Sequence, residues 1–387
     1  MVSFSKEHIY RPDGGLLVTW VPVVIFLRLL LARFFSMGGF KVAGALRGVW
    51  LDVDVKKRVE TKTKKKKEFG KVVLLGMEGS GKTTILKQAK IIYSKGFSTL
   101  ELTEFAPIIF YNIYESMKLL IINRRKFCIA EKDDDISQLC ELEDFLLMQD
   151  VNDHYQFNEK TYQTIIRLWA SSSIKKCYEM RSKFNLMDSA EYYLNALCDG
   201  RINFTGYIPS VKDILKCRLP SGDLSRHNFT IKGRHFEFVD IGGHRSQRIK
   251  WMHCLPEATA TCFIVSASDY DQGNRLREAM YFFEETLNQE FCKEHPFILL
   301  INKIDLLKKK LKVIPFNENF PEYKGGPHNF EEVQSFILRS FLSLNVNSKI
   351  LIYPYFTRAI DTDCMKSIFY AVSNIIVKNN LKKYSIL

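Results

Sequence analysis

The sequence predicts an α/β fold that contains a long all-helical stretch. Residues 71–75 (KVVLL) form a short run of β-branched and aliphatic residues, a glycine-rich loop follows, and ILKQAKII then begins a helical pattern. A second apolar run, FILLIN at 297–302, ends in polar residues, as a buried strand of a parallel sheet does. Residues 101–198 instead carry apolar residues at helical spacing and show no clear strand alternation. The chain therefore combines strands and helices at both ends of its folded part with helices alone in between.

The composition is that of a globular protein whose positive charge is concentrated at one end. A length of 387 residues exceeds the usual single domain of about 100 to 200 residues, so we expect two domains. With 46% hydrophobic and 26% charged residues, the chain is neither disordered nor fibrous. Residues 1–71 carry a net charge of +9 out of +13. A nucleic-acid-binding domain spreads its charge over the folded body, so this distribution excludes nucleic acid as the expected partner and favours a membrane surface.

Residues 1–68 are predicted to be an N-terminal extension of the folded part. The segment 16–35 is long enough to span a bilayer, but a proline and two arginines interrupt it. Three alternatives stay open for this segment: a membrane anchor, an unstructured or non-native extension, and a cleaved signal. The lysine run at 64–67 is either a solvated linker or a contact to an anionic membrane, worth about 1 kcal/mol per charge.

The glycine-rich loop has the spacing of a phosphate-binding P-loop. Gly76, Gly81, Lys82 and Thr83 satisfy the pattern G-x₄-G-K-[ST]. In such a loop the backbone N–H groups curl around the phosphates, the lysine reaches the β- and γ-phosphates, and the threonine hydroxyl ligates Mg²⁺. The pattern alone does not choose between ATP and GTP.

Two further motifs direct that choice to GTP. The sequence NKID at 302–305 follows the second apolar run, and the Asp305 carboxylate can accept both N1–H and N2–H of guanine, donors that adenine does not offer. The predicted strand 234–239 delivers Asp240 to the water shell of Mg²⁺, and Gly243 offers its N–H where a γ-phosphate would lie. The NKID motif is weak evidence alone, but its combination with the P-loop and the strand that ends at Asp240 predicts one GTP·Mg²⁺ site.

With these residues in view, the chain resembles the α subunits of heterotrimeric G proteins from about residue 69 to residue 387. Further matching stretches, in order, are DSAEYYL at 188–194, YIPSVKDILKCR at 207–218, KWMHC at 250–254, SDYD at 268–271, FPEYKG at 320–325, TRAIDT at 357–362 and NNLKKYSIL at 379–387. The resemblance implies a Ras-like P-loop GTPase domain, with a six-stranded mostly parallel sheet and flanking helices, at 69–98 and 210–387. It also implies an inserted all-helical domain at 99–209, with GTP bound in the cleft between the two domains.

The resemblance assigns catalytic and metal-binding roles to single residues. Arg218 is implied to be a built-in arginine finger, which neutralises charge developing on the γ-phosphate and is worth about 10³ to 10⁵ in rate. His244 stands where the family has the glutamine that orients the attacking water. Thr83, Ser221 and Asp240 are the implied Mg²⁺ residues.

The nucleotide contacts implied by the resemblance come from both domains. Asp188 and Ser189 would face the nucleotide from the helical domain, and Ala359 would present its backbone N–H to the guanine O6. The full set implied to bind the nucleotide is Glu78, Gly79, Ser80, Gly81, Lys82, Thr83, Thr84, Asp188, Ser189, Leu215, Lys216, Arg218, Gly243, Asn302, Lys303, Asp305 and Ala359.

The P-loop departs from the family sequence GAGESGKS, because Glu78 and Gly79 have exchanged places. We expect Glu78 to crowd the γ-phosphate, since a carboxylate about 5 Å from a phosphate charge costs roughly 3 kcal/mol per charge at an effective dielectric near 20. Gly79 is expected to be unable to replace the contact that the family glutamate makes near Arg218. Two further departures also point to slow hydrolysis: His244 replaces the family glutamine, and Pro220 stands in the segment that closes over the nucleotide. Slow GTP hydrolysis is the predicted consequence.

The implied function is that of a transducer at the cytoplasmic face of the plasma membrane. It would couple a seven-helix receptor, bound through 361–387, to an effector bound through switch II and the helix 274–289. The segment 245–254 in switch II resembles the family's βγ-binding part, and the N-terminus would supply peripheral membrane contact. The alternative is a GTP-bound or nucleotide-poor scaffold that does not hydrolyse GTP, and a membrane-inserted protein with a degenerate GTPase domain is a third interpretation.

The motif NKID predicts that the protein binds guanine nucleotides and not adenine nucleotides. Asp305→Asn should weaken GTP binding because it removes one of the paired acceptors for guanine. Competition of GTP and ATP against a fluorescent guanine nucleotide measures both effects. If ATP competes as well as GTP on the wild-type protein, guanine recognition by Asp305 is wrong.

Overall fold

The computed structural model describes residues 70–130, 136–148, 157–219, 224–243, 253–289, 292, 295–347 and 350–383. All of these residues belong to one compact unit, which spans Thr61–Gln149 and Gln156–Leu387. The predicted N-terminal extension, the predicted site residues Ser221 and His244, most of switch II and residues 384–387 lie outside the described residues.

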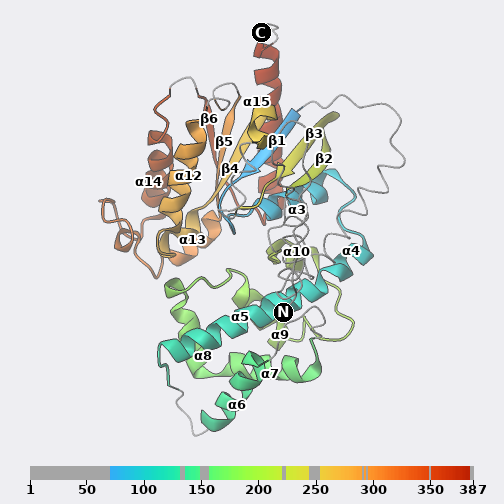
Figure 1. The fold of residues 1–387 in the computed structure, drawn as a ribbon, viewed down its shortest axis with the longest axis vertical. Helices are drawn as coiled ribbons and strands as arrows, with labels where there is room; N and C mark the ends of the chain where they lie inside the picture. The colour runs from blue at the N-terminus through green and yellow to red at the C-terminus, as the bar shows by residue number, and fades with distance from the viewer. Residues whose placement is uncertain are drawn as a thin grey trace, which may run out of the picture. The chain divides into compact units, whose positions relative to one another are not determined.

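A six-stranded sheet forms the first part of the fold (Figure 1). Its strands are β1 (Gly70–Leu75), β2 (Ser225–Ile231), β3 (Arg234–Asp240), β4 (Ala260–Ser266), β5 (Phe297–Asn302) and β6 (Ile352–Phe356). The strand order is β2-β3-β1-β4-β5-β6, with β2 and β3 antiparallel and every other pair parallel. The predicted six-stranded, mostly parallel sheet is confirmed, and the carboxyl ends of its parallel strands meet at one edge.

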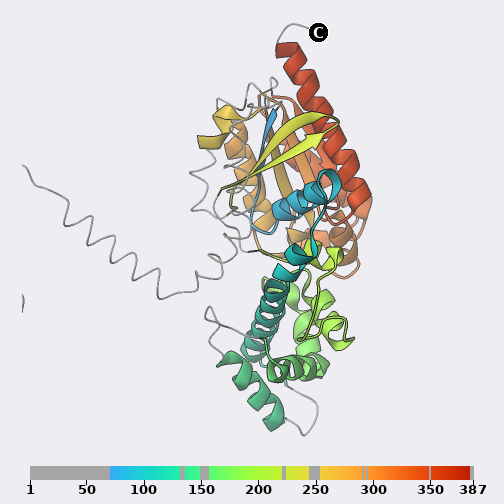
Figure 2. The same ribbon diagram turned by 90° about the vertical axis from the view of Figure 1, so that its right-hand side faces the viewer.

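Helices cover both faces of this sheet, which explains the continuous apolar runs of its strands (Figure 2). On one face, Val72 and Leu74 of β1 pack in a cluster with α3 (Lys82–Tyr93) and α15 (Thr362–Lys383). On the other face, Val73 and Leu75 pack in a cluster with α12, α13 and α14. The bounds of these three helices are Arg275–Leu287, Ile304–Lys310 and Phe330–Ser343.

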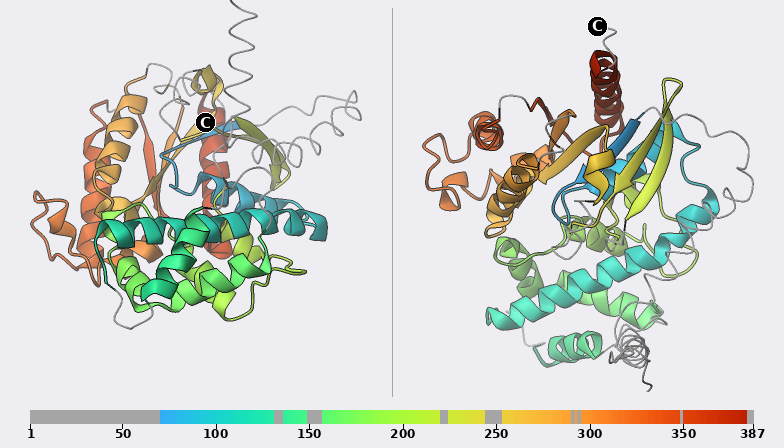
Figure 3. Two further views of the ribbon diagram at one scale, coloured as in Figure 1. Left: turned by 60° about the horizontal axis from the view of Figure 1, so that its bottom comes forward. Right: turned by 45° about the horizontal axis from the view of Figure 1, so that its top comes forward.

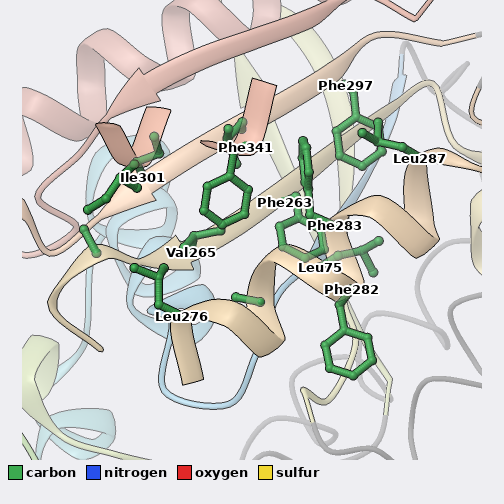
Figure 4. Packing of buried hydrophobic residues seen from close by; sticks show 14 of the residues in the cluster. Leu75, Phe263, Val265, Leu276, Phe282, Phe283, Leu287, Phe297, Ile301 and Phe341 are labelled. Carbon is green, nitrogen blue, oxygen red and sulfur yellow. The ribbon is translucent and has the colours of Figure 1, made fainter. Parts of the chain in front are cut away.

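Aromatic rings fill the core under α12 and α14 (Figure 4). Phe283 of α12 makes edge-to-face contacts with Phe263 of β4 and Phe341 of α14, at centroid distances of 5.2 and 5.3 Å. Phe297 at the start of β5 completes the group, 5.4 Å from the ring of Phe283. Since aromatic pairs in this geometry add to the free energy gained by burial, this core holds α12 and α14 against β4 and β5.

Helices alone make up the described chain between α3 and β2. They are α4 (Thr99–Glu104), α5 (Ala106–Lys126), α6 (Ile136–Leu147), α7 (Glu159–Ala170), α8 (Ser172–Glu179), α9 (Ala190–Cys198) and α10 (Val211–Lys216). Helices α5 to α9 pack on one another (Figure 3). The helical periodicity predicted for 101–198 is confirmed, whereas the exact domain boundaries 99 and 209 stay a prediction.

Short 3₁₀ turns occur both in this stretch and in the part of the chain that contains the sheet. They are Arg181–Lys183, Leu255–Glu257, Ala267–Asp271 and Phe316–Glu318.

Capping boxes start the first and the last helix of this helical stretch. The Ser98 side chain accepts from the Glu101 N–H and the Glu101 side chain accepts from the Ser98 N–H, and Ser210 and Asp213 repeat the arrangement. Each box satisfies two N–H groups that a helix start would otherwise leave without partners. The local sequence therefore fixes where the chain enters α4 and α10.

The segment Thr99–Lys126, formed by α4 and α5, is apolar and long enough to cross a membrane by length and composition alone. Within its most apolar window, 61% of the segment is buried inside the protein. Ile109, Ile113 and Met117 have no measurable exposure. The central helix of a packed helical domain is buried in this way. Packing inside the protein therefore explains the apolar composition of this segment.

Candidate nucleotide site

The P-loop follows β1 and bends through three glycines in conformations that disfavour side chains. Gly76, Gly79 and Gly81 have φ values of 141°, 76° and 110°. A Cβ atom at Gly76 would overlap the carbonyl oxygen of Ile264, and one at Gly81 would overlap the amide nitrogen of Asn302. Gly81 also has no side chain to cap α3, so the N–H groups at the start of this helix are left to bind an anion.

Lys82 lies folded over this loop. Its Nζ donates hydrogen bonds to the carbonyl oxygens of Gly76 at 2.8 Å and Met77 at 3.1 Å. Burial lowers the pKa of Lys82, while the charges of Asp240 and Glu78 oppose that shift. A cation held only by carbonyl dipoles can exchange them for a phosphate oxygen, which is a stronger acceptor.

Two buried oxygen atoms beside the loop have no hydrogen-bond partner within the described part of the chain. They are the Ser80 Oγ and the Asp240 Oδ1. Burial raises the pKa of Asp240 to about 6, although the charge of Lys82 counteracts this shift. Buried polar atoms without partners are rare, and a bound group that supplies partners is one explanation. The residues present therefore fit a phosphate and its magnesium ion.

Asn302, which was expected to bind the nucleotide, joins several loops around the cavity. Its Nδ2 donates to the carbonyl oxygen of Ser80 at 2.9 Å, and its Oδ1 accepts from the Thr357 hydroxyl at 3.1 Å. The same Oδ1 accepts the backbone N–H of Ala359 at 3.0 Å. Asn302 thus ties the P-loop to the loop between β6 and α15. In this structure the Ala359 N–H is donated to Asn302, and its expected offer to guanine O6 stays a prediction.

The residues of the NKID motif lie at the start of α13, next to the residues of the helical stretch that were expected to face the nucleotide. Asp305 is in the first turn of α13, and Lys303 caps that helix with φ 60°. The Lys303 Nζ donates to the Asp188 Oδ2 at 2.6 Å, and the Ser189 hydroxyl donates to the Lys216 carbonyl oxygen at 2.9 Å. Burial alone would raise the pKa of Asp188, but the charges of Lys303, Lys310 and Arg275, together with the hydrogen bond from Lys303, hold that pKa below its usual value. The helical residues therefore meet the NKID motif directly.

Arg218 and Glu78 form an ion pair, which corrects the expectation about the exchanged glycine and glutamate. The Arg218 Nη2 lies 2.6 Å from the Glu78 Oε1. Gly79 itself has no side chain to offer, but the carboxylate one position earlier makes the contact. Both side chains are partly exposed, at 42% and 27%. The negative charge of Glu78 is therefore opposed by Arg218 rather than directed at a phosphate alone.

One cavity collects nearly all of the nucleotide-binding residues that the sequence predicted. Those that line it are Glu78, Gly79, Gly81, Lys82, Thr83, Thr84, Asp188, Ser189, Leu215, Lys216, Arg218, Asn302, Lys303, Asp305 and Ala359. Ser80 and Gly243 are not among the lining residues. Gly243 instead lies against the P-loop, where a Cβ atom would overlap the backbone nitrogen of Glu78.

The cavity also has two charged residues that the sequence reasoning did not assign to the site. Arg275, at the start of α12, donates through Nη2 to the carbonyl oxygen of Glu78 at 2.6 Å and through Nε to the Asp269 Oδ2 at 3.1 Å. Asp269 lies in the matching stretch 268–271, so a signal for it existed. The pattern around Arg275 gave none, because the contact joins positions 197 residues apart.

The close contact between Gly81 and Asn302 predicts a sharp difference between two glycine substitutions. Gly81→Ala should weaken guanine-nucleotide affinity at least about tenfold, because the methyl group displaces either the P-loop or Asn302. Gly233→Ala is the control, since Gly233 also has positive φ (77°) but nothing within 4 Å of its Cβ position. It should cost about 1 kcal/mol of unfolding free energy and leave the affinity unchanged. Equal affinities of the two variants in a nucleotide titration would contradict the role of this contact.

The comparison with known families agrees with this geometry. A family model described as G-protein alpha subunit matches residues 52–376. The match includes the P-loop, the helical stretch, Arg218 and the NKID motif. Members of this family generally bind GTP or GDP with Mg²⁺ and act in signal transduction with receptors and β/γ subunits. The chain belongs to the G-protein alpha subunit family.

Proposed function

We propose that this protein is a GTP-operated switch that couples a seven-helix receptor to an effector and hydrolyses GTP slowly. The observation that carries the proposal is the single cavity in which the P-loop, Asp305 and Arg218 come together. The family membership supports the signalling role, and the cavity supports the use of guanine nucleotide by this chain.

Nucleotide binding divides between the two ends of the cavity. At one end, Asp305 would accept the N1–H and N2–H of guanine. At the other end, the P-loop N–H groups and Lys82 would hold the phosphates, with Lys82 releasing the carbonyl oxygens of Gly76 and Met77. A ligand that fills both ends must carry a guanine base and a phosphate chain, so the cavity selects a nucleotide over a free phosphate.

Magnesium would be held by the Thr83 hydroxyl, by Asp240 through water, and by the predicted ligand Ser221. Thr83 lines the cavity, and the Asp240 Oδ1 is buried without a partner in the described residues. When bound, Mg²⁺ offsets the negative charge of the phosphates. The hard oxygen atoms of these side chains are the ligand type that Mg²⁺ prefers.

Slow hydrolysis follows from the state of Arg218. Before it can stabilise charge on a γ-phosphate, Arg218 must leave Glu78 or share its guanidinium between the two anions. An exposed ion pair is worth at most about 1 kcal/mol, so the competition slows this step without preventing it. The expected contribution of His244 stays a prediction.

The alternative function is a scaffold that binds GTP without turning it over. In that case Glu78 would retain Arg218 even when GTP is bound. Single-turnover hydrolysis on the purified full chain distinguishes the two functions. A slow but measurable rate supports the switch, and retention of GTP over hours supports the scaffold.

The partner surfaces extend the proposal. The receptor would bind α15 and the residues after it (361–387), and the effector would bind switch II and α12 (274–289). On α12, Tyr281 is 60% exposed, which gives this helix an aromatic residue available to a partner. We further propose β/γ binding, peripheral membrane contact through the N-terminus, and a location at the cytoplasmic face of the plasma membrane.

The arginine finger predicts a separation of rate from affinity. Arg218→Cys should slow single-turnover hydrolysis by at least about a hundredfold, because the contact strengthens in the transition state. GTP affinity should change by less than about fivefold, since only an exposed ion pair is lost. A comparable loss of rate and of affinity would show that Arg218 serves ground-state binding.

The competition between Glu78 and the γ-phosphate predicts that Glu78→Gly and Glu78→Gln raise the rate. The expected rise is about fivefold, which corresponds to an exposed ion pair of about 1 kcal/mol. Glu322→Gln is the control, because it removes the partner of Arg277 in a comparably exposed ion pair away from the cavity. If both Glu78 variants hydrolyse GTP at the wild-type rate, Glu78 does not compete for Arg218.

A further inference from the structure

Asn112 holds the backbone of Arg218 with both ends of its amide. It lies on α5, in the helical stretch, and is 5% exposed. The Asn112 Oδ1 accepts the backbone N–H of Arg218 at 2.8 Å, and the Asn112 Nδ2 donates to the Arg218 carbonyl oxygen at 3.0 Å. One side chain thus supplies the pair of hydrogen bonds that a neighbouring β-strand would supply.

The chain around Arg218 depends on side chains for its position. Helix α10 ends at Lys216 and the next strand begins at Ser225, so no helix or strand of the described residues includes Arg218. Just before it, the buried Lys87 of α3 donates hydrogen bonds of 2.8 Å to the Cys217 carbonyl oxygen and to that of Ile214. Asn112 is the next buried restraint along the chain, and it acts on Arg218 itself.

The side chain and the backbone of Arg218 are held by contacts of different strength. Its guanidinium is paired with Glu78 in a partly exposed ion pair, which contributes little and exchanges readily. Its backbone is held by two hydrogen bonds to the buried Asn112 amide, and these cost more to break because the amide would lose both bonds away from water. The side chain can therefore move while its point of attachment stays fixed.

We propose that Asn112 is a positioning residue for the arginine finger, through which the helical stretch sets where Arg218 enters the cavity. Asn112 does not line that cavity, so it acts through Arg218 and not by touching the nucleotide. The catalytic part of this proposal rests on the proposed GTPase function. The hold on the Arg218 backbone rests on the structure alone.

The same helix offers a matched control for a purely structural role. Asn123 lies eleven residues further along α5, about three turns away, and is also 5% exposed. Its Nδ2 donates at 2.8 Å to the Leu119 carbonyl oxygen, one turn back in the same helix. Asn112→Ala and Asn123→Ala therefore remove the same group from equally buried positions, and only the first releases Arg218.

The experiment compares both variants in the full-length protein by three measurements. Hydrogen exchange should be up to about tenfold faster at the Arg218 amide in Asn112→Ala, and unchanged in Asn123→Ala. Single-turnover GTP hydrolysis should be about ten- to a hundredfold slower in Asn112→Ala only, with GTP affinity retained. Affinity for GDP–aluminium fluoride with Mg²⁺, a mimic of the transferring phosphoryl group, should fall with the rate.

A double variant tests whether Asn112 acts through Arg218. In the Arg218→Cys background, Asn112→Ala should slow hydrolysis by less than about twofold, because the group that it positions is already absent. If Asn112→Ala does not fold, Asn112→Asp replaces it. That variant keeps the size of the side chain but sets an oxygen against the Arg218 carbonyl, and it should slow hydrolysis as well.

The outcomes separate this proposal from the proposed function. Unchanged exchange at the Arg218 amide in Asn112→Ala, or equal slowing by Asn123→Ala, overturns the positioning role. Full additivity of Asn112→Ala with Arg218→Cys overturns it too. If the wild-type protein binds GTP but does not hydrolyse it, the GTPase function fails, while exchange and aluminium fluoride affinity still decide the role of Asn112.

Discussion

The buried amide of Asn302 is the constraint on which the candidate site depends. Its hydrogen bonds join the P-loop, the end of β5 and the loop after β6, three segments that are far apart in the sequence. They can approach this closely only because residue 81 is a glycine. A single side chain thus ties the P-loop to the loop after β6, and the strands that precede these loops belong to one sheet.

A second set of side chains places an arginine that no regular element carries. The buried side chains of Lys87 from α3 and Asn112 from α5 hold the backbone near Arg218 by hydrogen bonds, and Glu78 from the P-loop holds its side chain at the surface. The bonds to these buried side chains keep the attachment point fixed, whereas the partly exposed ion pair can exchange partners. The position of the Arg218 backbone and the mobility of its side chain are therefore controlled by different interactions.

The exchange of Glu78 and Gly79 shows how a local reading of the sequence can mislead. Counted along the P-loop, the carboxylate stands one position from where a contact to Arg218 is expected, and Gly79 has no side chain to make it. In the structure, the flexible glutamate side chain spans that difference and pairs with Arg218. In the proposed function, the electrostatic cost expected at the γ-phosphate is replaced by a competition between Glu78 and the phosphate for the Arg218 guanidinium.

The sequence alone determined the first strand, the P-loop, the buried strand that ends in NKID and the helical character of residues 101–198, because apolar periodicity and glycine spacing act between near neighbours. Asp305 was identified from its own contiguous motif, whereas the six-stranded sheet and the role of Arg218 were expected from the resemblance to G-protein α subunits. Only the tertiary structure decided which partners the polar side chains choose. The Asn112 contact to Arg218 joins residues 106 positions apart, and the Arg275 contact to Glu78 joins residues 197 apart. No local pattern encodes such pairs, because they form only when packing of the helices on one another and on the sheet brings buried donors and acceptors together.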